Sequence, residues 1–414
     1  MRRLLYLFPA LCLWVVAVGC GDQYRPVANP IIGQGGTPQT THYAFVVNNN
    51  PAGNSSTVQI DVSGDTNLQV QPAGAGAVSE AFLATTTAAI FTANSLADSV
   101  SEYTTFQSFS AVTTINMPLG SKPISVTSAR AGSMYVLNAS PNANCPSSGS
   151  ISIINTSALA VVGTFCVGPS PISFAQLPGG TKLYAVNADN TVSVFDPDAG
   201  LVTATLTQAS GLGLNPAFLI PSLDSNYVFV INKGDGTNPG SLSIITTIND
   251  QVAQTIPLGV GPTFATIDTH LLRLYVANTG GNSVTVFDLS TINLANNPGL
   301  ATLAAVNVGS GPVGITPLPD GTRFYTANSL SNDVTVVSAT AFSVLKTIPV
   351  GQGPVFIASE PTSTKVYTAN NTAGTVSIIQ TVNDTLVTNM PAPPQDSTCS
   401  QSCTLQQPSM ILTY

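Results

Sequence analysis

A short phrase, an aromatic or apolar run that ends in Asn, returns along the whole chain and constrains its fold more than any other feature. From Asn48 to Asn370 its mean period is 46 residues, within the ~40–50 residues expected of one propeller blade. The 414 residues therefore predict one large repeat domain. The phrase, called the anchor below, occurs eight times: FVVN (45–48), FTAN (91–94), YVLN (135–138), YAVN (184–187), FVIN (229–232), YVAN (275–278), YTAN (325–328) and YTAN (367–370).

The residues around each anchor predict four strands per repeat. In GPVGITPLPDGTRFYTANSLSNDVTVVSATAFSVLKTIPVG (311–351), a strand after Gly-Pro leads through a Pro-Asp-Gly turn to the anchor strand, then to an alternating strand and a final strand. In TVSIIQ (375–380), apolar residues alternate with Ser and Thr, which is typical of a strand that meets neighbours on both faces. Charged residues are only 7% of the chain, and no window offers a long amphipathic helix. The fold class is therefore all-β.

Each anchor suggests a structural role for its residues. The Tyr or Phe is expected to fill the core between two blades. The Asn is expected to hydrogen-bond to the turn that follows its strand. The alternative is that the Asn side chains line one mouth of the central channel.

The two ends of the repeat region predict how the ring closes. The first anchor strand (42–48) is preceded only by Gly- and Gln-rich sequence, whereas QPSMILTY (407–414) resembles an inner strand with no anchor after it. Placing Pro408 to Tyr414 as the inner strand of the first blade gives eight complete four-stranded blades and removes the open edges. A seven-bladed ring with one stray repeat is the alternative.

These motifs resemble the YVTN family of β-propeller repeats, found in many exported and surface proteins of bacteria and archaea. The most family-like stretches are RLYVAN (273–278), NSVTVFDLST (282–291) and KTIPVGQGP (346–354). The resemblance covers nearly everything after residue 41, although repeats one and two lack the Pro-Asp-Gly turn. It implies a propeller fold and little else, because members of the family serve varied roles.

The first residues predict an export signal, a tether and then the propeller. MRR supplies the positive start and Leu4 to Val18 the apolar stretch of a signal peptide over residues 1–19. Fifteen apolar residues interrupted by Pro9 are too few for the roughly 20 that span a bilayer. The Gly-, Pro-, Gln- and Thr-rich residues 20–41 are expected to form a flexible tether, and residues 42–414 a single propeller domain.

The sequence AVGC (17–20) resembles the lipobox of bacterial lipoproteins, in which the Cys, here Cys20, becomes the lipid-bearing first residue. Leu is more usual than Ala17 at its position, so ordinary secretion is the alternative. Gly21 replaces the aspartate that retains some lipoproteins on the inner membrane. We therefore expect a membrane-anchored lipoprotein of a bacterial cell envelope, with the outer membrane or cell surface favoured.

Export makes disulfides the expected use of the remaining cysteines. Without Cys12 and Cys20, four cysteines remain, which allow three pairings. Folding residues 149–167 into a hairpin brings Gly149 opposite Cys166, close to Cys145. We therefore predict the pairs Cys145 with Cys166 and Cys399 with Cys403.

Candidate chemistry is sparse. His270 occupies a predicted turn and His42 the edge of the first anchor strand, and neither stands near a cysteine, so no metal site is predicted. The motifs of nucleophilic catalysis, phosphate loops and haem attachment are absent, and no cofactor is predicted. With a formal charge of −8 and no basic cluster, a nucleic-acid partner is not predicted either.

One weak pattern involves the loops after the anchor strands, which should all open on one face of the disc. They carry four carboxylates, with Lys122 and Lys233 as the nearby cations. A mildly acidic mouth could attract a cation or a basic partner, although solvated loop residues are the simpler interpretation. The candidate binding-face residues are Asp98, Asp189, Asp235 and Asp333.

Two classes of function remain open. The first is a lipid-anchored binding or scaffold propeller without chemistry, which presents its loops to a protein or glycan. The second is a hydrolase resembling the lactonases that share propeller architecture. Such an enzyme needs His, Arg and Glu gathered in the channel, whereas Glu80, Glu102 and Glu360 belong to unrelated repeats.

Overall fold

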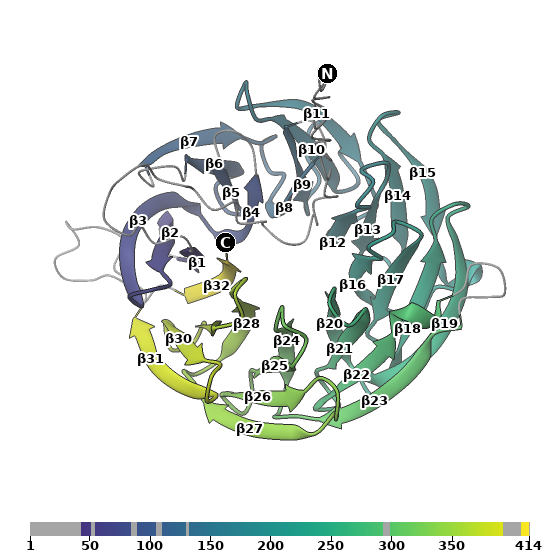
Figure 1. The fold of residues 1–414 in the computed structure, drawn as a ribbon. Coiled ribbons are helices and arrows are strands. Elements are labelled where there is room, and N and C mark those ends of the chain that lie inside the picture. Colours follow the sequence, from purple (N-terminus) through teal and green to yellow (C-terminus); the bar gives the residue numbers. More distant parts are fainter. Residues whose placement is uncertain are drawn as a thin grey trace, which may run out of the picture.

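The chain folds into an all-β, eight-bladed propeller in which each blade is a four-stranded antiparallel sheet (Figure 1). The computed structural model describes residues 43–50, 54–83, 89–104, 110–129, 132–292, 299–391 and 407–413. The predicted fold class and blade number are confirmed. Two short 3-10 turns, η1 (Gln208–Ser210) and η2 (Leu289–Thr291), accompany the strands.

The blades follow one another in chain order, and each extends from an inner strand at the channel to an outer strand at the rim. Blade 1 has β32 (Gln407–Thr413), β1 (Tyr43–Asn49), β2 (Asn54–Asp61) and β3 (Thr66–Ala75). Blade 2 has β4 (Ala77–Leu83), β5 (Ala89–Asn94), β6 (Ser99–Thr104) and β7 (Ser110–Asn116). Blade 3 has β8 (Pro123–Ser128), β9 (Ser133–Asn138), β10 (Ser150–Asn155) and β11 (Ala160–Cys166). Blade 4 has β12 (Pro171–Gln176), β13 (Leu183–Asn187), β14 (Val192–Asp196) and β15 (Leu201–Leu206).

The second half of the ring repeats the same order. Blade 5 has β16 (Pro216–Pro221), β17 (Tyr227–Asn232), β18 (Pro239–Thr246) and β19 (Gln251–Val260). Blade 6 has β20 (Pro262–Asp268), β21 (Arg273–Asn278), β22 (Ser283–Asp288) and β23 (Ala301–Asn307). Blade 7 has β24 (Pro312–Pro317), β25 (Arg323–Asn328), β26 (Asp333–Ser338) and β27 (Val344–Pro349). Blade 8 has β28 (Pro354–Ser359), β29 (Lys365–Asn370), β30 (Thr375–Gln380) and β31 (Thr385–Pro391).

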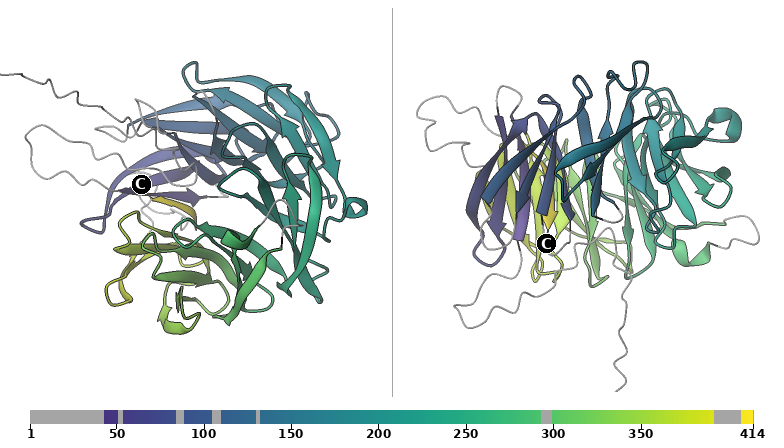
Figure 2. Two further views of the ribbon diagram at one scale, coloured as in Figure 1. Left: turned by 45° about the vertical axis from the view of Figure 1, so that its right-hand side comes forward. Right: turned by 90° about the horizontal axis from the view of Figure 1, so that it is seen from above.

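The antiparallel strand order gives the disc two different faces, which the edge-on view shows at the ends of the strands (Figure 2). One face, called the connector face, carries the loops after the anchors and the connections from each outer strand to the next inner strand. The other, called the turn face, carries the inner-to-second and third-to-outer turns. The chain enters the propeller at Tyr43 and leaves β32 at Thr413, and both residues lie at the turn face.

The core is divided among the eight interfaces between neighbouring blades. The described residues form eight clusters of buried hydrophobic side chains, each drawn from two adjacent blades. Second strands such as β5 and β17 are buried along their whole length, whereas outer strands such as β15 alternate between exposed and partly buried residues. The Ser and Thr of the third strands fit this arrangement because both faces of a blade are covered.

The anchor Tyr and Phe fill the core between blades, as predicted, whereas the anchor Asn bonds mainly to the third strand rather than to the turn that was expected. All eight aromatic rings are at most 5% exposed, and each lies in the cluster between its own blade and the next. All eight Asn side chains are also buried, and each Nδ2 donates to the third strand of the same blade or to the residue just before that strand. For example, Asn138 donates to Ser150 and Ser152 at 3.0 and 2.9 Å.

The tight packing of these Asn side chains explains the glycines that stand three residues before the first Pro of an inner strand, such as Gly168 and Gly351. A Cβ added to Gly168 would lie 2.2 Å from Asn187 Nδ2, and one added to Gly351 would lie 2.6 Å from Asn370 Nδ2. Real Cβ atoms do not approach that closely, so only glycine fits at these positions.

Ring closure follows the predicted scheme, with the last strand completing the first blade. β32 pairs antiparallel with β1, so that Val46 lies opposite Ile411 and Ala44 opposite Thr413 (Figure 1). On its other side β32 meets blade 8, where Thr413 Oγ1 donates to the carbonyl of Ser359 at 2.8 Å. The seven-bladed alternative is therefore wrong.

The predicted disulfide of blade 3 is present. Cys145 and Cys166 are bonded, with their Cα atoms 5.4 Å apart. The register differs by one residue from the sequence prediction, because a bulge between Ile153 and Ile154 places Ser150, rather than Gly149, opposite Cys166. The predicted pair Cys399 with Cys403 lies outside the described residues.

We predict that replacing both Cys145 and Cys166 by Ser will lower the free energy of unfolding by about 3 kcal/mol, because the bond closes a loop with a sequence separation of 21 residues. Urea unfolding of the double variant and of the parent checks this. An unfolding midpoint that is unchanged in the variant would contradict the prediction.

Candidate functional site

Polar side chains on the turn face join neighbouring blades at several positions. In blade 4, Lys182 Nζ lies 2.7 Å from Asp250 Oδ2 of blade 5, and the Tyr184 hydroxyl donates to Asp250 Oδ1 at 2.5 Å. Blades 7 and 8 repeat the arrangement. There Asp384 binds Arg323 Nη1 at 2.7 Å and the Tyr325 hydroxyl at 2.5 Å. We call this contact an inter-blade tie.

Local geometry explains why each tie forms. The basic residue stands two positions before the anchor Tyr, and residues two apart on a strand point to the same side. The Asp is the last residue of the third-to-outer turn, where φ is 53° for both Asp250 and Asp384. Asp tolerates this left-handed conformation better than most residues. Burial raises the pKa of Tyr184, and its hydrogen bond to Asp250 raises that pKa further, so the hydroxyl stays protonated and donates.

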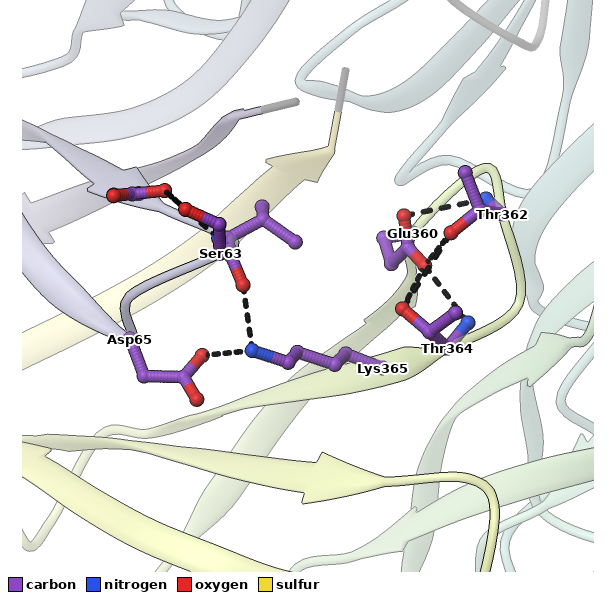
Figure 3. Close-up of polar contacts among 8 residues, drawn as sticks. Ser63, Asp65, Glu360, Thr362, Thr364 and Lys365 are labelled. Carbon is purple, nitrogen blue, oxygen red and sulfur yellow. Dashed lines mark hydrogen bonds and ion pairs between the residues drawn. The ribbon is translucent and has the colours of Figure 1, made fainter. Parts of the chain in front are cut away.

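A third tie lies where the ring closes (Figure 3). Lys365 of blade 8 reaches Asp65 Oδ1 and the carbonyl of Val62 in blade 1, each at 2.5 Å. Nearby, Glu360 accepts from the hydroxyls of Thr362 and Thr364. Burial alone would raise the pKa of Glu360, but these hydrogen bonds outweigh burial and lower it.

The junction of blades 6 and 7 departs from this pattern. Phe342 (φ 52°) takes the turn position that Asp has in the three ties, and Arg273 stacks 5.0 Å from the centre of its ring. At this junction the acidic residue that lies near Arg273 belongs to the same blade. It is the buried Asp268, which lies opposite Arg273 in the β20–β21 pair. His270 is an exposed turn residue, as predicted, and donates its backbone N–H to Asp268. His42 lies outside the described residues.

The four predicted binding-face carboxylates lie on the connector face, in blades 2, 4, 5 and 7. Each accepts hydrogen bonds from its own loop or from the adjacent connection. Asp98 accepts from the backbone N–H groups of Gly120 and Lys122, and Asp333 accepts from Asn328 Nδ2 at 2.7 Å. Asp189 accepts from Thr191 Oγ1 at 2.6 Å.

Asp235 is the most strongly hydrogen-bonded of the four. Asn238 donates to it from both its backbone and its side chain, and Thr237 does the same, which lowers the pKa of Asp235 well below its usual range. Among the residues that the structure describes, no three His, Cys, Asp or Glu side chains come close enough together to hold a metal ion. The structure therefore places the four carboxylates on one face without bringing them together.

Sequence reasoning missed the apolar residues of the same face. Four leucines stand in its loops and are 39–88% exposed: Leu96, Leu119, Leu214 and Leu330. Leu96 and Leu330 occupy equivalent places, each directly after Asn-Ser, and each covers a glycine of the neighbouring connection. A Leu inside a loop otherwise made of Ser, Asn, Asp and Gly is the pattern that could have revealed them.

The inner strands carry few titratable residues. In the described inner strands, Glu80 of β4 and Asp268 of β20 are the only charged residues. The remaining residues are apolar, hydroxyl-bearing, amide or glycine. Glu102 lies on the third strand of blade 2 and Glu360 in a turn of blade 8, so the three Glu residues do not converge.

No known family model matches the chain, and no curated protein matches it either. Among solved structures, a chain of hydrazine synthase from Kuenenia stuttgartiensis is similar with a TM-score of 0.56 and 16% identity, covering 74% of this chain and 96% of that one. A protein of unknown function from Desulfotomaculum acetoxidans is also similar, with a TM-score of 0.46 and 16% identity over 57% of this chain and 74% of that one. At 16% identity, the likeness to the hydrazine synthase chain shows the fold alone.

The ties predict a specific loss of stability. Asp384→Asn removes the charge that holds Arg323 and weakens the acceptor of Tyr325, so we expect the free energy of unfolding to fall by about 1–3 kcal/mol. Asp320→Asn is the matched control, because Asp320 is exposed and accepts only within its own turn. That control should stay within about 0.5 kcal/mol of the parent. Equal losses in urea unfolding would refute the tie.

Proposed function

We propose that this chain is a lipid-anchored β-propeller of the YVTN repeat type that acts in a bacterial cell envelope as a non-catalytic binding or scaffold protein. The observation that carries the proposal is the difference between the two faces. On the turn face, carboxylates and cations bind each other across blade junctions. On the connector face, exposed leucines stand beside carboxylates that are bound within their own loops and connections rather than to cations of the next blade, and a mixture of apolar and polar groups is suited to a protein or glycan partner. Apolar residues such as Ile248 and Val382 are exposed on the turn face as well, so the two faces differ in how their charges are paired.

The positions of the chain ends support this use of the connector face. The propeller begins at Tyr43 on the turn face. A tether upstream of Tyr43 therefore joins the disc on the side opposite the exposed leucines. A lipid on Cys20 would hold the protein at a membrane and leave the connector face free for a partner.

Export is supported by the cysteine chemistry. The Cys145–Cys166 bond is of the kind that persists in oxidising compartments. In the part of the chain that the structure describes, no helix is long and apolar enough to cross a bilayer.

Cys20→Ala is expected to move the protein from the membrane fraction to the soluble fraction, since acyl chains would supply the anchoring. Cys12→Ala, inside the predicted signal peptide, is the matched control and should remain with the membranes. Detergent-phase partitioning measures both. Recovery of Cys20→Ala with membranes as fully as the parent would refute lipidation.

The binding face is tested by site-specific photo-crosslinking in native membranes. Crosslinkers at Leu96 and Leu330, which are 60% and 74% exposed, should capture a partner. The controls are Ile248 and Val382 on the turn face, which are 88% and 77% exposed. Capture from the turn-face positions alone would contradict the proposed orientation.

A further inference from the structure

A buried carboxyl group interrupts the apolar pattern of the inner strands. Glu80 lies in the middle of β4 and is 2% exposed. Glu80 lies opposite the second residue of its anchor. At the same position the other seven inner strands have an apolar residue, and all seven of these residues are buried. These residues are Val126, Phe174, Leu219, Ala265, Ile315, Ile357 and Ile411.

The surroundings of Glu80 are polar but uncharged. Its Oε1 accepts from Thr57 Oγ1 of blade 1 at 2.7 Å and from Thr92 Oγ1 of its own blade at 3.4 Å. Its Oε2 is buried and has no hydrogen-bond partner among the described residues. A buried polar atom without a partner carries a substantial free-energy cost, so the residue is not simply a replacement for an aliphatic side chain.

This carboxyl group lies beside the strand that closes the ring. The backbone N–H of Glu80 contacts Met410 Sδ of β32 at 3.3 Å. The core between blades 1 and 2 is also the smallest of the eight among the described residues, with six buried hydrophobic side chains, whereas eleven form the core between blades 8 and 1. Among the described residues, fewer buried hydrophobic side chains therefore pack on this side of the closing blade than on the other.

No countercharge faces Glu80 in the described part of the chain. Thr57 on β2, Thr92 on β5 and Met410 on β32 do not titrate, and Tyr103 on β6 is the only titratable group that faces it. Burial, followed by smaller contributions that include the charge of Glu80, raises the pKa of Tyr103 to about 12, and its hydroxyl donates to the carbonyl of Pro72 at 3.1 Å. Glu102 is adjacent to Tyr103 on β6 and therefore points to the opposite side of the blade.

Burial raises the pKa of Glu80 to about 8, although the hydroxyls of Thr57 and Thr92 oppose this shift. In the unfolded or opened chain the same group titrates near 4.3. Because the folded pKa is the higher one, the stabilisation is fully present at acidic pH and is lost as the pH rises to about 8. The opening equilibrium constant then increases by up to about tenfold for each pH unit in that range.

We propose that the junction of blades 1 and 2 is a pH-sensitive seam, which neutral Glu80 keeps closed and which loosens beside the closing strand β32 when Glu80 ionises. The charged form of Glu80 destabilises the closed seam, because one carboxylate oxygen has no hydrogen-bond partner and no cation lies nearby among the described residues. The seam would open where the ring was joined, between β4 and β32.

Hydrogen exchange of the β32 and β4 amides, corrected for the intrinsic effect of pH, tests the seam in the full mature chain. In the parent the opening constant should rise by up to about tenfold per pH unit between about pH 5 and 8 and then level off. Glu80→Gln should remove this rise. Glu102→Gln, the same substitution on the opposite side of the blade, should keep it.

A second variant keeps the test decisive if Glu80→Gln does not fold. Glu80→Ile introduces the residue found at this position in blades 1, 7 and 8, and its β32 amides should show no pH-dependent opening over the same range. Parallel pH profiles for the parent and either folded Glu80 variant would overturn the proposal. A rise confined to amides far from β4 and β32 would overturn it as well.

Discussion

The pairing of β32 with β1 is the interaction on which the rest of the propeller depends. Each blade is apolar on both faces, and the hydrophobic clusters lie between blades rather than inside them. An open row of blades would therefore leave two apolar faces in water, at a cost of about 25 cal/mol for each Å² of apolar surface. When the C-terminal strand enters the first blade, every blade gains a neighbour on both sides.

The two faces of the closed disc differ in how their charged groups are paired. On the turn face, Lys or Arg before the anchor Tyr meets an Asp of the next blade at three junctions, so charges are paired across them. On the connector face, carboxylates such as Asp98 and Asp235 are bound within their own loops and connections, and leucines stand exposed between them. The face that is less occupied with holding blades together is the better candidate for holding a partner.

Much of this architecture could be predicted from the sequence because the repeat encodes it locally. The spacing of the anchors predicted the blades, the unmatched strand at 407–414 predicted the closure, and the hairpin around Cys166 predicted the disulfide. The inter-blade ties could not be predicted in this way. They join residues between 59 and 300 positions apart, such as Tyr325 with Asp384 and Lys365 with Asp65, and depend on a left-handed turn residue whose conformation the sequence does not specify.

The candidate site was predicted less completely than the fold. Strand order placed Asp98, Asp189, Asp235 and Asp333 on one face, but hydrogen bonds within each loop depend on exact backbone geometry. Glu80 shows the same limit, because its position among apolar residues becomes visible only when the inner strands are aligned by their bulges.

The central claim is that the last strand closes the ring by completing the first blade, and one pair of truncations tests it most directly. Removing residues 407–414 deletes the inner strand of blade 1, whereas removing residues 22–28 shortens only the predicted tether. The account predicts a large fall in the melting temperature for the first truncation and almost none for the second. Equal melting temperatures for the two truncated proteins would contradict it.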